Sequence, residues 1–369
     1  MSTTNKLTYK ESGVDYETID YIKRIAQLAG KKTVNNLPKN YKEIIQSRGE
    51  SAHVVDTGEY YFASVIEGLG TKNLVADEMY RLTGKTYYDS LAYDTVAMII
   101  NDLITVGAKP LTLMAYWAAG SSDWFKDKKR ADDLVSGWTK ASQDSGVIWG
   151  GGETPVLSEI INKDAIDLAG ACFGIINPKK NLCLGKKLQA GDRIILFESS
   201  GIHANGLTLA RKIAESLPEG YLTKVNKKQT YGQALLEPTI IYAQLIRELL
   251  KNTIDIHYMV NITGHGWRKL MRHQKSLTYR ITDLPPVPPV LKFIVEQGKL
   301  DESEAYGNFN MGAGFAIFVP EKDVDQVLNF AKQNQIKVYN YGLVEEGEKK
   351  VIIEPINIIF AKESLQVRA

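Results

Sequence analysis

Cysteine is scarce in this sequence, which has only Cys172 and Cys183 among its 369 residues. Two cysteines cannot form a disulfide framework, and they supply too few thiolates for a structural zinc site. The sequence also lacks a His-Glu-x-x-His segment, the usual zinc-binding pair of a metallohydrolase. It therefore indicates neither a disulfide-stabilised scaffold nor a zinc hydrolase.

Long apolar runs and an excess of one charge are also lacking. No run approaches the roughly 18 apolar residues that span a bilayer, and residues 1–10 are polar, unlike a signal peptide. There are 45 lysines and arginines against 43 aspartates and glutamates, so the formal net charge of +2 provides no basic field for nucleic acid. We therefore expect a cytoplasmic protein that binds neither membrane nor nucleic acid.

The composition is that of an ordinary globular protein, with 44% hydrophobic and 24% charged residues. A chain of 369 residues is too long for one typical core, so two domains are expected. The segment 177–192 is polar and lysine-bearing and contains Pro178 and Gly185, which favours a linker. We predict an N-terminal domain over residues 1–180 and a C-terminal domain over residues 190–369.

Apolar patterns with the periods of strands and helices alternate along both halves of the chain. Helices are predicted over 89–106, 128–144 and 235–250, and strands over 60–66, 111–117, 147–149, 166–176, 193–197, 315–319, 338–344 and 351–353. Both halves therefore share a pattern of mixed helices and strands, typical of α+β structure.

The most informative segment is the turn Glu67-Gly68-Leu69-Gly70-Thr71-Lys72, which directly follows the apolar strand 60–66. Its glycines let the backbone approach a ligand closely, its lysine can meet a phosphate, and its carboxylate can bind a hard cation. It is not a P-loop, because Thr71 precedes Lys72. The turn points to nucleotide phosphates, with an ordinary strand-to-loop transition as the alternative.

The predicted helix 89–106 places Asp94, Met98 and Asp102 along one face, because they are spaced four residues apart. Asn101 and Asp102 lie within an otherwise apolar stretch. A carboxylate among apolar residues needs a partner, a cation or a proton, and a magnesium ion is one solution. The alternative is that the acids simply form a solvated helix face.

Two more polar segments each follow a predicted strand. Gly150–Thr154 holds three glycines before Glu153, which suits a backbone that approaches a ligand beside an oxygen donor; a flexible turn is the alternative. Ser199–Gly206 places His203 and Asn205 just ahead of a predicted helix, whose N-terminus favours an anion. His203 is a candidate proton carrier, although a lone histidine is more often structural.

Taken together, these segments resemble the aminoimidazole ribonucleotide synthetase (phosphoribosylformylglycinamidine cyclo-ligase) family. The similarity runs through most of the chain. It rests on the segments Tyr9–Asp15, Gly68–Lys72, Asp94–Met98, Asn101–Leu103, Gly107–Leu111, Gly151–Thr154, Ser199–Gly206, Pro238–Tyr242 and Phe309–Gly312.

The resemblance implies a PurM-like fold of class α/β + α+β: an N-terminal α/β domain whose mixed sheet forms a barrel across a homodimer, and a C-terminal α+β domain. It implies that ATP, with Mg²⁺, converts formylglycinamidine ribonucleotide to aminoimidazole ribonucleotide in purine biosynthesis. ATP would phosphorylate the formyl amide oxygen, and a substrate nitrogen would then close the imidazole ring.

The resemblance also assigns roles to residues. Glu67 and Asp102 would hold the metal ion, with Asp94 and Glu153 as further donors. His203, Lys72 and Asn205 would take part in catalysis. Nucleotide-binding residues would be Gly68, Gly70, Thr71, Lys72, Asp94, Asn101, Gly151, Gly152 and Glu153.

The chain departs from the family pattern near the nucleotide. Glu67 stands where the family usually has aspartate, and the stretch 34–56 contains only Gly49 where the family has a glycine-rich loop. Two alternatives therefore remain: a related ATP-dependent kinase or synthetase acting on another substrate, and a dimeric partner protein without catalysis.

Overall fold

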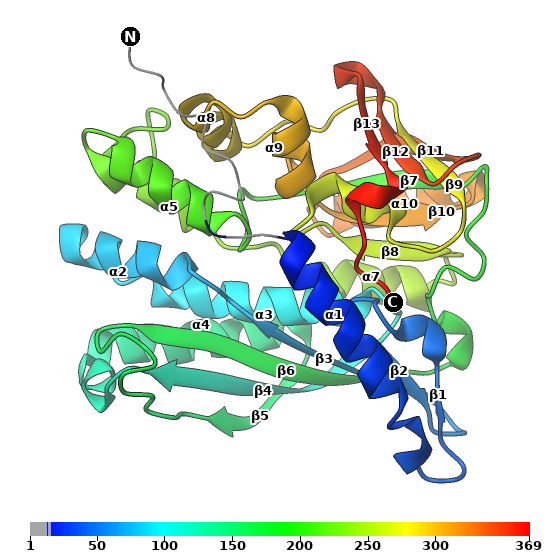
Figure 1. Cartoon of the computed structure of the whole chain (residues 1–369), viewed down its shortest axis with the longest axis horizontal. Helices are drawn as coiled ribbons and strands as arrows, with labels where there is room; N and C mark the ends of the chain where they lie inside the picture. Colours follow the sequence, from blue (N-terminus) through cyan, green and yellow to red (C-terminus); the bar gives the residue numbers. More distant parts are fainter. Residues whose placement is uncertain (1–12, 14–15) are drawn as a thin grey trace.

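The computed structural model describes residue 13 and residues 16–369, and it arranges the chain around two separate β-sheets (Figure 1). The first is built from residues before 177 and the second from residues after 192. The predicted domain limits themselves stay a prediction. The opening segment Tyr9–Asp15 lies outside the described residues except for Gly13.

The first sheet is mixed and has six strands. Its order is β1 (Lys42–Glu43), β2 (His53–Asp56), β3 (Tyr61–Gly68), β6 (Ile166–Ile176), β4 (Lys109–Ala119) and β5 (Ile148–Glu153). All neighbours are antiparallel except β4 and β5, which run parallel. β6 alternates buried and more exposed positions along its whole length, the pattern of a sheet covered on one face.

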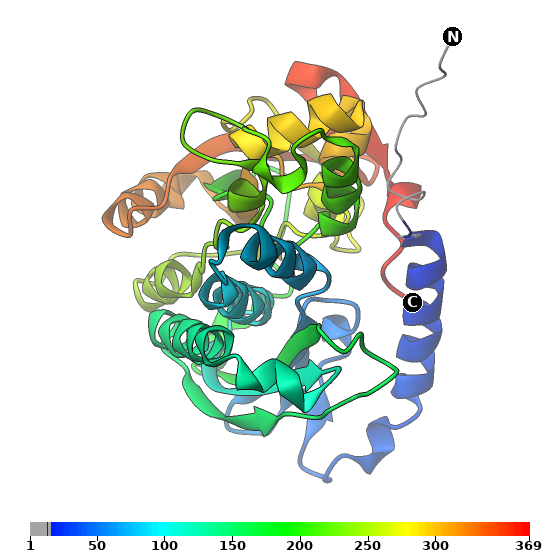
Figure 2. The same cartoon turned by 90° about the vertical axis from the view of Figure 1, so that its left-hand side faces the viewer.

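Three helices cover that buried face: α2 (Lys72–Thr83), α3 (Tyr88–Ile104) and α4 (Lys128–Ser145) (Figures 1 and 2). α3 lies between the first sheet and the second domain, and nearly all of its residues are buried. The opposite face of the sheet carries exposed apolar side chains, with Ile66 75% and Ile148 68% exposed. No described helix covers that face in Figure 1.

The second sheet has seven strands. Its order is β13 (Ile358–Ala361), β12 (Lys350–Ile353), β9 (Leu277–Ile281), β11 (Val338–Glu346), β7 (Arg193–Glu198), β10 (Ala313–Val319) and β8 (Tyr258–Asn261). Around it lie α5 (Leu207–Ser216), α6 (Tyr231–Leu235), α7 (Ala243–Lys251), α8 (Pro289–Gly298), α9 (Glu302–Asn308) and α10 (Val324–Gln333). Every residue of the apolar strand β10 is buried, so this strand forms the centre of the second core. The two sheets with their helices confirm the predicted PurM-like fold class.

Two segments differ from the sequence prediction. The helix predicted over 235–250 forms only from Ala243 onward, as α7, because residues 236–242 leave the helical conformation around Pro238 and bond to α3 instead. The glycines at 150–152 are part of strand β5 rather than a loop after it. Gly150 forms a bulge opposite Leu113, which explains why a glycine run is tolerated in this strand.

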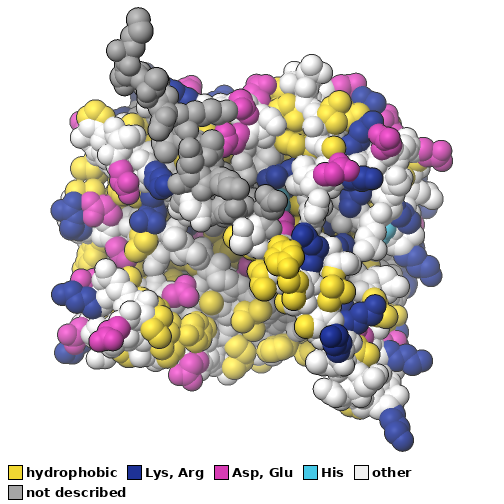
Figure 3. Space-filling view, viewed as in Figure 1, with side chains coloured by type: hydrophobic (Ala, Val, Ile, Leu, Met, Phe, Trp, Pro, Cys, Tyr) yellow, Lys and Arg dark blue, Asp and Glu magenta, His cyan; other side chains and the backbone are white. Residues whose placement is uncertain are grey.

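The first helix and the last residues of the chain lie side by side (Figure 2). α1 (Tyr16–Lys31) turns polar residues toward the second domain, and Gln27 Nε2 donates to Val367 O at 2.9 Å. Its apolar side chains face solvent, with Ile22 58% and Leu28 56% exposed, and Figure 3 shows hydrophobic side chains gathered over this helix. Within the described residues, none of the helices has both the length and the apolar content needed to cross a membrane.

Candidate active site

A cavity of about 400 Å³ lies where α1, the end of β3, α3 and the second domain meet. Its walls come from distant parts of the sequence: Lys23, Gln27, Gly49, Glu50, Ser51, Glu67, Met98, Asp102, Asn205, Asn261, Thr263, Gly264, His265, Lys269, Arg272, Leu365 and Val367. Of the predicted site residues, Glu67, Asp102 and Asn205 are brought together here.

Two carboxylates form the acidic side of this cavity. Glu67 is the second-to-last residue of strand β3. Asp102 lies on the face of helix α3 that also presents Met98. Burial and, to a lesser degree, the charge of Asp102 raise the pKa of Glu67 to about 8, while the charge of Lys269 opposes the rise. The nearby charge of Asp102 therefore makes Glu67 hold its proton more tightly.

Two cations face these acids from the second domain. Lys269 and Arg272 lie on or just after the short helix η6 (Gly266–Met271). Lys269 Nζ donates to Thr263 Oγ1 and, at 3.3 Å, to Asn261 O. Burial lowers the pKa of Lys269 to about 8, and the charge of Asp102 partly offsets this effect. The cavity thus sets negative groups of the first domain against positive groups of the second.

Two side-chain amides complete the polar lining. Asn261 Nδ2 donates to Asp102 Oδ1 at 2.7 Å and so fixes the carboxylate from the opposite domain. Asn205 Nδ2 is buried and has no hydrogen-bond partner among the described residues. A buried amide without a partner is costly, so this donor is suited to an acceptor on a bound ligand.

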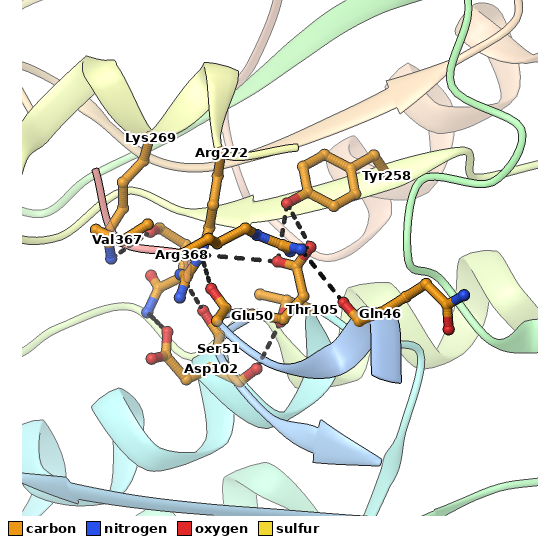
Figure 4. A network of polar contacts seen from close by, with 12 residues as sticks. Gln46, Glu50, Ser51, Asp102, Thr105, Tyr258, Lys269, Arg272, Val367 and Arg368 are labelled. Atoms are coloured by element: carbon orange, nitrogen blue, oxygen red, sulfur yellow. Dashed lines mark hydrogen bonds and ion pairs between the residues drawn. The ribbon is translucent and has the colours of Figure 1, made fainter. Parts of the chain in front are cut away.

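The residues 365–369, which we call the C-terminal strap, close the cavity on its outer side. Leu365 and Val367 line it, and Arg368 forms an ion pair with Glu50 (Figure 4). Tyr258 also donates to Glu50, at 2.8 Å, and Arg272 Nε donates to the carbonyl of the adjoining Gly49 at 3.0 Å. The strap therefore holds the loop 49–51 through Arg368, while Tyr258 and Arg272 hold the same loop against the second domain.

The predicted residue Lys72 lies outside this cavity. Its ammonium is fully buried and forms an ion pair with Asp94 Oδ2 at 2.5 Å. It also donates to His203 O at 2.9 Å and Glu237 O at 3.1 Å. All three of its protons are thereby used, so the predicted contact with a phosphate requires this ion pair to open. That contact remains a prediction.

Asp94, a predicted metal and nucleotide ligand, is fully buried in the same cluster. Thr239 donates to Asp94 Oδ1 from its backbone at 2.7 Å and from its hydroxyl at 2.5 Å. Burial raises the pKa of Asp94, and the charge of Lys72 opposes that rise. Its oxygens are therefore already occupied by protein donors, and the predicted ligand role would require them to be released.

His203 is also buried away from the cavity. The backbone N–H of Ser200 donates to its Nε2 at 3.3 Å, and a Cβ on Gly314 would lie 2.5 Å from its Cε1. The ring thus packs against strand β10. Burial and, to a lesser degree, Lys72 lower the pKa of His203 to about 3, so its imidazole is neutral at ordinary pH. The predicted proton transfer requires this ring to be reached by substrate.

The other predicted nucleotide residues lie at two places. Gly68, Gly70 and Thr71 form the turn between β3 and α2, beside Glu67 but outside the cavity lining. Asn101 bonds Ile240 O at 2.8 Å and the Tyr242 N–H at 3.0 Å, which ties α3 to the start of α7.

Gly151, Gly152 and Glu153 lie on the exposed edge strand β5. Gly152 shares one cross-strand row with Glu67, through Gly170 and Ala115. Three strand spacings separate them, or roughly 14 Å. The structure does not bring these residues to the Glu67–Asp102 pair within one chain.

Sequence reasoning missed Lys269, Arg272, Asn261 and the strap. Lys269 stands three residues after the segment Thr263–Gly266, a glycine cluster of the kind found at ligand sites, so a local signal existed. Arg368 gave no comparable signal, because its contacts join residues more than 300 positions apart. No group of three or more histidine, cysteine or acidic side chains suited to a metal ion occurs in the described part of the chain.

Two family models match the chain and define it as a two-domain AIR synthase related protein. The N-terminal domain model matches residues 49–176, and the C-terminal domain model matches residues 189–354. The phosphoribosylformylglycinamidine cyclo-ligase of Methanobrevibacter smithii is 35% identical over 93% of this chain and 96% of the relative. That of Pyrococcus furiosus is 34% identical over 96% of this chain and 99% of the relative. The chain therefore belongs to the phosphoribosylformylglycinamidine cyclo-ligase family, which confirms the resemblance found in the sequence motifs.

Solved structures share the fold at low sequence identity. The structure titled "Crystal structure of HypE-HypF complex" matches with a TM-score of 0.62 at 15% identity, covering 91% of this chain and 98% of that one. "AaThiL complexed with AMPPCP and TMP" matches with a TM-score of 0.60 at 15% identity, covering 97% of each chain. At this identity the likeness shows the fold alone.

Proposed function

We propose that this chain catalyses the ATP-dependent cyclisation of formylglycinamidine ribonucleotide to aminoimidazole ribonucleotide, with ADP and phosphate as the other products. Relatives at 34–35% identity over nearly the full length of both chains support this reaction. The observation that carries it in the structure is the cavity itself. Glu67 and Asp102 from the first domain face Lys269 and the unpartnered Asn205 of the second.

ATP and Mg²⁺ are part of this proposal. Solved structures of the same fold were obtained with AMPPCP, which supports a nucleotide at this fold. The lining fits a divalent cation, because Mg²⁺ in nucleotide sites takes one or two carboxylates together with phosphate oxygens. Burial and the charge of Asp102 raise the pKa of Glu67 even though Lys269 and Arg272 oppose the rise, so a further positive charge at this pair would be favourable. Glu67 and Asp102 would hold the ion, which when bound neutralises phosphate charge.

The protein's own residues bind and orient the reactants. Lys269 and Arg272 lie where they can neutralise phosphate oxygens. The γ-phosphoryl group leaves ADP and forms a P–O bond to the formyl amide oxygen. A substrate nitrogen then attacks the formyl carbon and loses a proton, which forms the ring C–N bond. The bond between this carbon and the formyl oxygen breaks, and the oxygen leaves as part of the phosphate. Asn205 Nδ2 supplies a donor that orients the substrate.

A homodimer is also part of the proposal. The exposed face of the first sheet presents Ile66, Ile148 and Leu111, which are 75%, 68% and 39% exposed. An apolar sheet face of this kind suits another apolar sheet, and a second copy of the chain would offer one of the same shape. The barrel predicted from the family resemblance would arise in this way. The cytoplasmic location predicted from the sequence stays part of the same proposal.

One assay tests the reaction. Purified protein is incubated with ATP, Mg²⁺ and formylglycinamidine ribonucleotide, and both ADP and the diazotisable amine product are measured. We expect both to appear in equal amounts and only with the substrate present. ADP formed on thiamine monophosphate instead, or no nucleotide binding by calorimetry, would establish one of the two alternatives. The low-identity fold matches give those alternatives no support.

A further inference from the structure

A second cavity, of about 450 Å³, lies on the far side of α3 from the candidate active site. We call it the basic groove. It is formed by the end of α3 with the start of β4, by the linker 177–181, and by one face of α7. Its lining is Ile104, Gly107, Ala108, Lys109, Pro110, Ser145, Ile175, Asn177, Pro178, Lys180, Asn181, Ala243, Ile246, Arg247, Leu250, Lys251 and Thr253.

The charge of the basic groove is entirely of one sign. Lys109, Lys180, Arg247 and Lys251 line it, and no aspartate or glutamate does. None of the four forms an ion pair or side-chain hydrogen bond with another described residue, whereas Lys140, Lys187 and Lys337 each pair with a carboxylate. The Arg247 guanidinium lies against Gly146, where a Cβ would come within 2.7 Å of it, so the backbone there leaves room for this cation. Four unneutralised cations around one cavity attract an anion.

The floor of the groove is apolar. Ala108 and Pro110 from the start of β4 meet Ala243, Ile246 and Leu250 from α7. Asn177 and Asn181 add side-chain amides at the linker side. An apolar floor with a few polar groups at its rim is the usual construction of a small-molecule site, and the volume lies in the usual range. Inorganic phosphate alone would leave this floor uncovered.

We propose that the basic groove is a second ligand site, separate from the cyclo-ligase site. Its ligand is a small organic anion with an apolar body of about nucleoside size and a phosphate group. The body covers the apolar floor, and the phosphate is bound by Lys180 and Arg247 with support from Lys109 and Lys251. A nucleoside phosphate and an aryl phosphate share this chemistry.

The groove is connected to the candidate active site through one helical turn. Ile104 enters the groove while Asp102 enters the active-site cavity, because residues two apart point to opposite sides of a helix. Asn101, next to Asp102, bonds the N–H of Tyr242 directly before α7, which forms the groove wall. A ligand that fixes α7 against α3 therefore acts on the element that positions Asp102.

Calorimetry with the whole purified protein tests this site. The probes are AMP and 1-naphthyl phosphate. Adenosine and 1-naphthol are controls for the apolar body without the phosphate, and inorganic phosphate is the control for the charge without the body. A saturating non-hydrolysable ATP analogue occupies the candidate active site throughout. We expect at least one of the two phosphate probes to bind, and K180E/R247E to weaken that binding at least tenfold. The matched variant K227E/K228E reverses two exposed lysines elsewhere and should bind as the wild type does.

Each remaining outcome decides against the site. Equal binding of inorganic phosphate and both probes would show an anion-attracting surface only. Binding that K180E/R247E leaves unchanged would place the probe elsewhere, and absence of binding by both probes would overturn the proposal. All four substituted side chains are exposed, so thermal unfolding should confirm that both variants fold. Which probe binds more tightly tells the two ligand sources apart.

Discussion

At the scale of single residues, the candidate site is a balance of buried charges. Asp102 is 7% exposed and is held by Asn261, while Glu67 beside it carries a raised pKa. Glu67, at a position where the family resemblance leads us to expect aspartate, still places a carboxylate in the cavity lining. The longer side chain still reaches the wall shared with Asp102. Changes to either acid therefore act on both.

Replacing Asp102 by asparagine should abolish turnover while the fold persists. The change removes the charge that would hold the cation but keeps the size of the side chain, so we expect kcat to fall at least 100-fold, as for other lost electrostatic contacts in active sites. ADP release and thermal unfolding are the two measurements. Asp123→Asn, on an exposed turn, is the control. Near-normal turnover in Asp102→Asn would show that the metal assignment is wrong.

The raised pKa of Glu67 predicts a pH effect on stability without ligand. The folded state binds the Glu67 proton more tightly than the unfolded state, whose pKa is about 4.5. Its stabilising contribution is thus complete below about pH 4.5 and is lost as pH rises to about 8. In urea unfolding from pH 5 to 8, the wild type should lose stability relative to Glu67→Gln. If the free energies of unfolding of the two proteins changed in parallel with pH, the raised pKa of Glu67 would be contradicted.

At the scale of elements, α3 is the part that joins the two domains. The sequence predicted this helix over 89–106, close to the observed Tyr88–Ile104, because its acids recur with helical spacing within an apolar stretch. Strand β6 was predicted with its observed bounds for a similar reason, its apolar content. The helix predicted over 235–250 was wrong because Asn101 captures the backbone at Ile240 and Tyr242, a contact that no local pattern reveals.

Because local patterns do not reveal tertiary contacts, the sequence predicted only part of the candidate site. Glu67, Asp102 and Asn205 stood in recognisable motifs, so the sequence placed them near a ligand. Lys269 and Arg368 reach the cavity or its wall only through tertiary packing. Lys72 had the right neighbours in sequence but points to Asp94 instead, because a buried carboxylate attracts the nearest ammonium.

Replacing Asn101 by alanine tests the joint between α3 and the segment before α7. The buried Tyr242 N–H and Ile240 carbonyl would each lose a partner, and each such loss costs about 1–3 kcal/mol. We therefore expect the free energy of unfolding to fall by about 2–6 kcal/mol. Asn252→Ala removes one exposed bond to Glu248 O and is the matched control. Equal stability of the two variants would show that this joint contributes little.

At the scale of the whole molecule, the open face of the first sheet is an apolar surface that the described residues leave uncovered. Ile66→Asp should convert the proposed dimer to a monomer, since it places a charge on the apolar face. Light scattering after gel filtration measures this. Ile359→Asp, 61% exposed on β13, is the control and should keep the dimer. A monomeric wild type would remove the dimer from the proposal.

The strap predicts a second effect at this scale. Arg368→Ala leaves Glu50 with the Tyr258 hydroxyl and with Arg272 Nε at 3.7 Å, so the loop 49–51 should loosen. We expect the Kd for ATP to rise at least fivefold, with a smaller loss of thermal stability. Arg81→Ala removes an exposed ion pair with Glu78 and should change neither quantity. An unaltered Kd in Arg368→Ala would show that the strap is not part of the ligand site.

The path of the strap also has a consequence for biosynthesis. The cavity uses Lys23 and Gln27 from the start of the chain and Leu365 and Val367 from its last described residues. A nascent chain can therefore complete the first sheet on the ribosome long before the pocket has all its walls. The pocket should become able to retain its ligand only after residue 368 has left the exit tunnel.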